Sequence, residues 1–113
     1  MSFKNCQKDV DDWVNQFKNP YWPPLSILAR VTEEVGELGS ELNERYGGRV
    51  KKSTENVKDI GIEICDIIFA LFCLANSHKI DLDDSWKNVM NKCWGRDNKR
   101  FERKEDNENS KQV

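Results

Sequence analysis

Residues 60–75 read Ile-Gly-Ile-Glu-Ile-Cys-Asp-Ile-Ile-Phe-Ala-Leu-Phe-Cys-Leu-Ala, the longest apolar run in the chain. On a helical wheel of about 100° per residue, apolar side chains lie almost all round this segment. The only charged residues inside it are Glu63 and Asp66, which share one narrow sector. A helix that is apolar on nearly every side is buried on nearly every side. The run therefore predicts a central helix, from about Val57 to Ser77, around which an all-α fold is built.

Three further helices are predicted around this run. Apolar residues at helical spacing extend from about Phe3 to Lys18, where Asn19-Pro20 ends the pattern because proline cannot continue a helix. A second helix begins near Pro24-Leu25 and stops at Gly47-Gly48. A fourth follows Asp81, which is placed to cap its first turn. Three other helices could scarcely cover the central one, so the pattern indicates a four-helix subunit whose central helices are buried in an oligomer.

Length and charge set the class of protein. With 113 residues the chain is long enough for one domain. We expect a helical domain over residues 1–101 and a charged, disordered tail over residues 102–113, where apolar side chains are almost absent. The net charge of −2 gives no hint of a nucleic-acid binder. The apolar run is shorter than the roughly 20 residues that cross a bilayer, and the N-terminus lacks a signal-peptide pattern. We therefore expect a cytoplasmic protein with neither membrane nor nucleic acid as partner.

The cysteines do not form a metal or redox motif. None belongs to a Cys-x-x-Cys pair, and each lies among apolar residues at helical spacing. We expect them to be buried structural thiols. They are Cys6, Cys65, Cys73 and Cys93.

Glu63 and Asp66 are an unusual pair for the middle of an apolar helix. Their spacing of three residues points both carboxylates the same way. Two like charges there repel each other, and removing each from water costs several kcal/mol. Within a turn of either acid this helix offers no cation except Lys58 at its start. A cation from elsewhere must therefore offset the pair.

The second helix carries a matching pair, Glu34 and Glu37, at the edge of its apolar stripe. If the two helices pack antiparallel, the four carboxylates can converge, and oxygen ligands without His or Cys suit Mg²⁺ or Mn²⁺. The alternative for such a glutamate-rich helix is a solvated face, but the apolar surroundings of the acids on the central helix favour a metal site. Gly36 and Gly39 leave room beside these acids either for a ligand or for a closely packed helix.

Two motifs in these segments resemble those of a known protein family. The segment Thr32-Glu33-Glu34-Val35-Gly36-Glu37-Leu38 resembles the EExxE motif of the MazG-type nucleoside triphosphate pyrophosphohydrolases. Glu63-Ile64-Cys65-Asp66 resembles the ExxD motif that follows it, and the stretch Leu71–Leu82 is also similar. The likeness covers about Asp12 to Arg103, and the short single-domain bacterial members of the YpjD type look closest.

The resemblance implies Mg²⁺-dependent, or Mn²⁺-dependent, hydrolysis of a (deoxy)nucleoside triphosphate to the monophosphate and pyrophosphate, as nucleotide-pool housecleaning. It also implies helical subunits interlocked as dimers or tetramers. A carboxylate, Glu33 or one of the metal ligands, would orient the attacking water. By position, the residues that match the family's metal ligands are Glu34, Glu37, Glu63 and Asp66. Those that match its phosphate-contacting residues are Lys92 and Arg96.

Some alternatives stay open on the sequence. Phe17, Tyr21 and Trp22 could stack on a nucleotide base or belong to the core or an interface. Lys51 and Lys52 could close over phosphates or form a solvated loop. A related substrate on the same scaffold is possible, namely phosphoribosyl-ATP, dUTP or dCTP. A different class is a catalytically silent helical module that oligomerises and binds a partner protein; it predicts no divalent ion and no nucleotide turnover.

Overall fold

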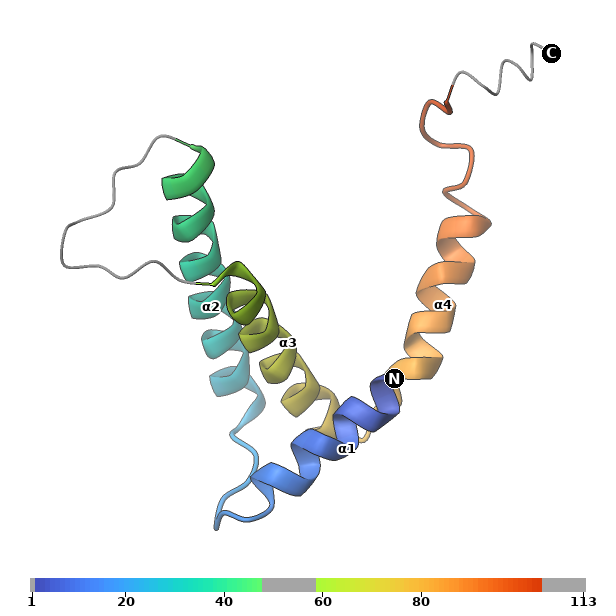
Figure 1. Ribbon diagram of the computed structural model, residues 1–113. Helices are drawn as coiled ribbons and strands as arrows, with labels where there is room; N and C mark the ends of the chain where they lie inside the picture. Colours follow the sequence, from blue (N-terminus) through green and yellow to red (C-terminus); the bar gives the residue numbers. More distant parts are fainter. Residues whose placement is uncertain (1, 48–58, 105–113) are drawn as a thin grey trace. The chain divides into compact units, whose positions relative to one another are not determined.

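The computed structural model describes residues 2–47 and 59–104, and these form helices and connecting turns without any strand. In chain order the helices are α1 (Phe3–Val14), α2 (Pro24–Tyr46), α3 (Ile60–Ser77) and α4 (Leu82–Trp94) (Figure 1). The predicted all-α class is confirmed. The chain divides into two units, one up to Asp81 that holds the first three helices and one from Leu82 onward that holds α4.

Local capping explains where the helices begin. At the start of α1 the Ser2 hydroxyl accepts a hydrogen bond from the backbone N–H of Asn5. At the start of α3 the Asp59 carboxylate accepts one from the backbone N–H of Ile62. Both bonds satisfy an N–H group that a helix leaves without a partner in its first turn. Helix α2 begins at Pro24, as predicted, because proline has no N–H to satisfy there.

Helix α1 is shorter than predicted, since it ends at Val14 and not near Lys18. The side-chain amide of Asn15 donates a hydrogen bond to the carbonyl of Asp11 at 2.7 Å. Side-chain amides of this kind satisfy the carbonyls of a last turn and so compete with continuation of the helix. The apolar pattern extended beyond this point through Phe17, which follows the helix and is 53% exposed.

Three expectations fall partly or wholly outside the described residues. They are the basic loop that carries Lys51 and Lys52, the first residues of the central helix from Val57, and the tail beyond residue 104. Residues 102–104 follow α4 without helical structure. The division into a domain over residues 1–101 and a disordered tail stays a prediction.

Within the first unit, α2 and α3 run antiparallel and lie side by side, and α1 packs on α3 (Figure 1). The antiparallel pair is the arrangement that the two acidic motifs need in order to meet. The core consists of small and medium aliphatic side chains and one phenylalanine: Val10, Val14, Ile27, Ala70, Phe72 and Ala75.

A polar network ties α1 to the C-terminal end of α3. The Gln7 side-chain amide donates to Asn76 Oδ1 at 2.9 Å and to the carbonyl of Ile80 at 2.8 Å. Asn76 Nδ2 donates to the carbonyl of Gln7 at 2.9 Å and to the Tyr21 hydroxyl at 3.1 Å. The Tyr21 hydroxyl in turn donates to a carboxylate oxygen of Asp11. Because every member has a partner, the network fixes the connector between α1 and α2.

Much of the apolar surface of α3 is exposed in the single chain. Its 18 residues have a mean hydropathy of 1.8, yet only 22% of them are buried. By length and composition alone such a helix could cross a membrane, but the core helix of a soluble protein passes the same test. One chain thus covers only part of the helix that the sequence predicts to be buried all round. The large exposed side chains on it are Ile62, Ile64, Ile68, Phe69 and Leu71.

The prediction of buried cysteines is wrong for two of the four. Cys65 and Cys93 are exposed, whereas Cys6 and Cys73 are half-buried, and all four are free thiols. Cys65 lies on the uncovered surface of α3, and Cys93 lies on α4, a helix with no buried residue. Helical spacing predicts which side of a helix a cysteine lies on, but it does not show that another segment covers that side.

Candidate metal centre and adjoining pocket

Three carboxylates converge between α2 and α3. Glu34 and Glu37 on α2 and Glu63 on α3 each offer one oxygen atom, and these atoms lie within 4.8 Å of one another. The three-residue spacing places the α2 pair on one face of its helix. The antiparallel packing then brings that face to the acid on α3.

Glu34 and Glu63 are buried although they are acids, with exposed fractions of 3% and 6%. In each, the Oε1 atom has no hydrogen-bond partner among the described residues. Burial raises the pKa of Glu34, and the guanidinium of Arg30 opposes this rise. The neighbouring carboxylates raise the pKa further; they belong to Glu37, Asp66 and Glu63. Buried oxygens without partners are costly unless a cation binds them.

The donor set fits Mg²⁺ or Mn²⁺. It consists of carboxylate oxygens alone, which are the hard ligands that both ions prefer. The two Oε1 atoms without partners can form bonds to a cation without breaking any interaction described for them. Among the described residues, a methyl group added at Gly36 or Gly39 would meet nothing within 4 Å. Packing among these residues therefore does not require a glycine at either position, which leaves both readings of the sequence open, a ligand or a closely packed helix.

Two further predicted acids lie beside this cluster. Asp66, one turn after Glu63, is exposed and lines the adjoining pocket, and it is not one of the three mutually close ligands. Its charge nevertheless acts on Glu34. The side chain of Glu33 is 67% exposed, and its carboxylate lies 3.8 Å from Nη1 of Arg30. Glu33 thus borders the site without entering the cluster.

Arg30 is a charged neighbour that sequence reasoning missed. Its Nη2 atom lies 2.7 Å from Oε2 of Glu34, so one oxygen of that carboxylate is paired. The sequence pattern that indicates missing compensation concerns only the central helix, where Lys58 is the one cation near the acids. The signal was present on α2, because Arg30 precedes Glu34 by four residues and therefore shares its face. This pairing engages Oε2 of Glu34 and leaves Oε1 of Glu34 and Oε1 of Glu63 without a partner among the described residues.

A pocket of about 500 Å³ lies in the first unit beside these acids. Trp13 packs edge-to-face on Phe17 at a centroid distance of 5.0 Å and on Phe69 at 6.0 Å. All three residues line the pocket, together with Tyr21 and Trp22. Its size and its aromatic walls suit a small planar ligand. The sequence pointed to three of these aromatic residues, Phe17, Tyr21 and Trp22, but did not identify Trp13 and Phe69 as walls.

Polar groups of the pocket include Arg30 and Asp66, which also border the carboxylates. On another wall, the Tyr21 hydroxyl donates its proton to Asp11, and its oxygen accepts a hydrogen bond from Asn76. Burial and the hydrogen bond to Asp11 raise the pKa of Tyr21 to about 12. Tyr21 is therefore a protonated, immobilised part of the wall.

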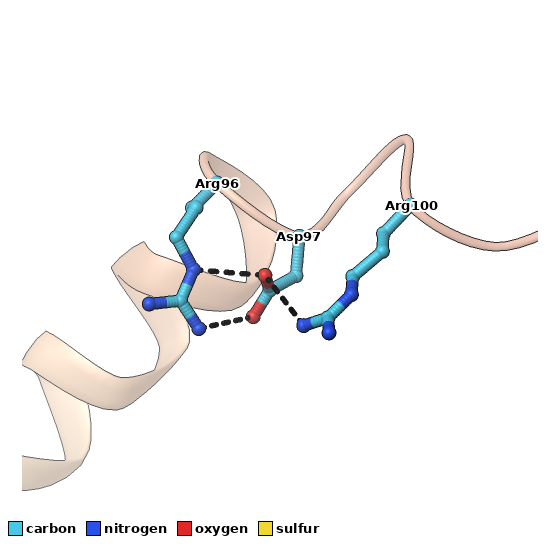
Figure 2. Close-up of polar contacts among 3 residues, drawn as sticks. All are labelled: Arg96, Asp97 and Arg100. Carbon is cyan, nitrogen blue, oxygen red and sulfur yellow. Dashed lines mark hydrogen bonds and ion pairs between the residues drawn. The ribbon is translucent and has the colours of Figure 1, made fainter.

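The predicted phosphate-contacting residues belong to the second unit. Lys92 lies in the last turn of α4 and Arg96 follows the helix, and both are exposed. Figure 2 shows that Arg96 donates to Asp97 through Nε at 2.9 Å and Nη2 at 3.1 Å, with Nη1 of Arg100 at 3.5 Å from the same carboxylate. These contacts lower the pKa of Asp97. Two N–H groups of Arg96 are used in this way, and its others remain for an anion.

Comparisons with known proteins bear on this arrangement. Residues 23–101 match the family model of the MazG nucleotide pyrophosphohydrolase domain. YpjD of Bacillus subtilis (strain 168), described as uncharacterized, is 47% identical over 105 residues, which is 93% of this chain and 95% of that protein.

Two solved structures are similar to this fold. A crystal structure of YpjD from Bacillus subtilis has a TM-score of 0.73 at 47% identity, covering 81% of this chain and 94% of the other. That of the Bacillus-conserved MazG protein, a nucleotide pyrophosphohydrolase, has a TM-score of 0.68 at 41% identity, covering 81% and 88%.

Proposed function

Because the chain belongs to the MazG nucleotide pyrophosphohydrolase family, we propose that it hydrolyses (deoxy)nucleoside triphosphates to the monophosphate and pyrophosphate. One observation carries this proposal. Glu34 and Glu63 are buried and each has a carboxylate oxygen without a partner among the described residues, and Arg30, which pairs with Glu34, lines an aromatic pocket large enough for a nucleotide base. A charged centre beside a planar apolar pocket matches the two halves of a nucleotide.

Glu34, Glu37 and Glu63 would hold a divalent cation, with Asp66 as a fourth ligand one turn along α3. When bound, Mg²⁺ or Mn²⁺ supplies positive charge that polarises the phosphate oxygens of the substrate. The support for this ligand set is the chemistry of the donors and the burial of Glu34 and Glu63, which leaves their charge without sufficient compensation.

The chain's own groups would do the remaining work, since phosphoryl chemistry depends mainly on positioning and charge stabilisation. Phe17 and Trp22 would hold the base. An ionised carboxylate, that of Glu33 or of a metal ligand, would orient the attacking water and take its proton. Lys92 and Arg96 would neutralise the leaving pyrophosphate.

The assembled enzyme would be a homo-oligomer, a dimer or a tetramer, in the cytoplasm. The apolar side chains that α3 exposes in a single chain support this proposal. A monomer rarely leaves so many large apolar side chains of one helix in water. A second copy is the occupant that the central position of this helix favours.

Turnover of a nucleotide panel tests the proposal. Ribo- and deoxyribonucleoside triphosphates, dUTP, dCTP and phosphoribosyl-ATP should be supplied with Mg²⁺, with Mn²⁺ and with chelator. We expect monophosphate and pyrophosphate in equal amounts with either metal and no product with chelator. Glu63→Gln should remove most turnover, whereas Glu44→Gln, on α2 but away from the cluster, should turn over like the parent.

The products separate the candidate activities. Release of orthophosphate and a diphosphate would contradict attack at the α-phosphorus. Turnover confined to phosphoribosyl-ATP, dUTP or dCTP would identify a specialised member of the family. No turnover of any nucleotide, with no effect of Mg²⁺ on stability, would leave the silent helical module as the function.

A further inference from the structure

Arg30 lies at the junction of the two halves of the site. It lines the aromatic pocket, and its Nη2 atom lies 2.7 Å from Oε2 of Glu34. The described contacts thus place one guanidinium between a pocket suited to a base and carboxylates suited to a cation. A side chain at this junction can contact the part of a ligand that connects a base in the pocket to an anionic group at the carboxylates.

The pair of Arg30 and Glu34 does not have the order that stabilises a helix. An acid four residues before a base is the better order, because it agrees with the helix dipole. Later on α2, Glu41 and Arg45 have that favourable order, with Nε of Arg45 at 3.3 Å from Oε2 of Glu41. Arg30 precedes its acid instead, so helix stability alone is a poor reason for an arginine at this position.

Arg30 also keeps donors for a ligand. A guanidinium has five N–H groups, and the contact with Glu34 engages only its Nη2 end. Glu33 is 3.8 Å away from Nη1, beyond hydrogen-bond distance. The side chain is 52% exposed, although the carboxylate that it pairs with is almost fully buried. Arg30 therefore keeps N–H groups that none of the hydrogen bonds described for it engages, and the residue itself lines the pocket.

We propose that Arg30 binds the α-phosphate of the nucleotide, in the triphosphate substrate and in the monophosphate product. This inference rests on the proposed function. With the base in the aromatic pocket and the outer phosphates at the metal centre, the α-phosphate lies between them, where Arg30 is. Arginine presents several donors in a plane that matches phosphate oxygens, which lysine does not.

Product binding without turnover tests this role. The four deoxynucleoside monophosphates and their nucleosides should be titrated in chelator by calorimetry into the parent and into Arg30→Gln, Arg30→Lys and Arg45→Gln. Hydrogen bonds to charged groups correspond to about tenfold or more in affinity. We expect Arg30→Gln to weaken monophosphate binding by about this factor while nucleoside binding stays within about twofold, since only the phosphate contact is lost. Arg30→Lys should fall between, and Arg45→Gln, the matched pair outside the pocket, should equal the parent.

The ratio of the two affinities decides the result. An unchanged ratio of monophosphate to nucleoside affinity in Arg30→Gln would overturn the role, as would equal weakening of both ligands, which would assign Arg30 to the base or to the pocket wall. Failure of the parent to bind any monophosphate would overturn it as well. Pyrophosphate release by the parent tests the proposed function separately, so an active enzyme with an unchanged ratio refutes only the role of Arg30.

Discussion

Replacing Glu63 with glutamine distinguishes a metal centre from an ordinary structural acid. The Glu63 side chain is 6% exposed, and its Oε1 has no partner among the residues described. Glutamine has nearly the same shape, carries no charge, and can donate to the neighbouring Glu34 carboxylate. Without metal, the change removes a buried charge and its repulsion with two other acids. We therefore expect Glu63→Gln to be more stable than the parent in chelator.

The burial of Glu63 determines how much more stable Glu63→Gln should be than the parent in chelator. Leaving a buried polar group unsatisfied costs about 1–3 kcal/mol, so relief of that cost should raise the free energy of unfolding by about 1–2 kcal/mol. For a domain of about 100 residues, each kcal/mol corresponds to roughly 4–8 °C in Tm. With Mg²⁺ at about 100 times its Kd, the parent gains about 2.7 kcal/mol from binding. The variant lacks one ligand and gains little, so the parent should become the more stable protein by about 1 kcal/mol.

Thermal melts at one protein concentration, with chelator and with Mg²⁺, measure both differences. Glu41→Gln is the control, because Glu41 is equally buried but is paired with Arg45 at 3.3 Å. Breaking a buried pair leaves a charge uncompensated, so the control should be destabilised by the same amount in both buffers. The reasoning is refuted if Glu63→Gln behaves like this control and loses stability equally with and without Mg²⁺.

Four other outcomes are expected. Lys92→Ala and Arg96→Ala should each lower kcat/KM by about tenfold or more, with unchanged circular dichroism, because a contact with the charged phosphates is lost; kinetics equal to the parent would make both ordinary surface charges. Burial raises the pKa of Glu34 above its ordinary value of 4.5. In the metal-free protein, the protonated Glu34 therefore contributes its full stabilisation below pH 4.5, and this stabilisation is lost as the pH rises through the raised pKa of the folded state. Glu34→Gln should remove this fall in denaturant melts with chelator. Absorbance titration should show a tyrosine step near pH 12 that Tyr21→Phe abolishes, since the pKa of Tyr21 is about 12; a step that persists would contradict the assignment. Light scattering at low micromolar concentration should give at least a dimer, and a stable folded monomer would refute the oligomer.

The helices and the acidic cluster could be predicted because they depend on local spacing. Period and capping residues identify a helix such as α2 almost to its ends. Each of the two helices carries a pair of acids three residues apart, and antiparallel packing of the helices brings these acids together. Glu34, Glu37 and Glu63 converge in this way. Asp66 shared the same signal, yet it lines the pocket and is not one of the three close ligands. Spacing fixes the helix face on which a side chain lies, but not the distance between its oxygen atoms and another helix.

The features that were missed depend on contacts between residues far apart in the sequence. Gln7 and Asn76 are 69 positions apart, and no periodic pattern relates them. The end of α1 at Val14 depends on the competing amide of Asn15, a side-chain bond that apolar spacing does not reveal. Arg30 is a simpler case, since it lies on α2 beside Glu34, whereas the pattern that indicates missing compensation concerns α3 alone.

The tie between Tyr21, Asp11 and Asn76 has a consequence for inhibitor chemistry. The hydroxyl of Tyr21 has one proton to give and gives it to Asp11, and Asn76 already donates to its oxygen. A compound that aims an acceptor at this hydroxyl must displace the bond to Asp11, which cancels most of what it gains. Flat, polarisable surface laid against the ring keeps both bonds intact. An inhibitor should therefore place a flat apolar group against Tyr21 and carry its polar groups on the side of the pocket that holds Arg30.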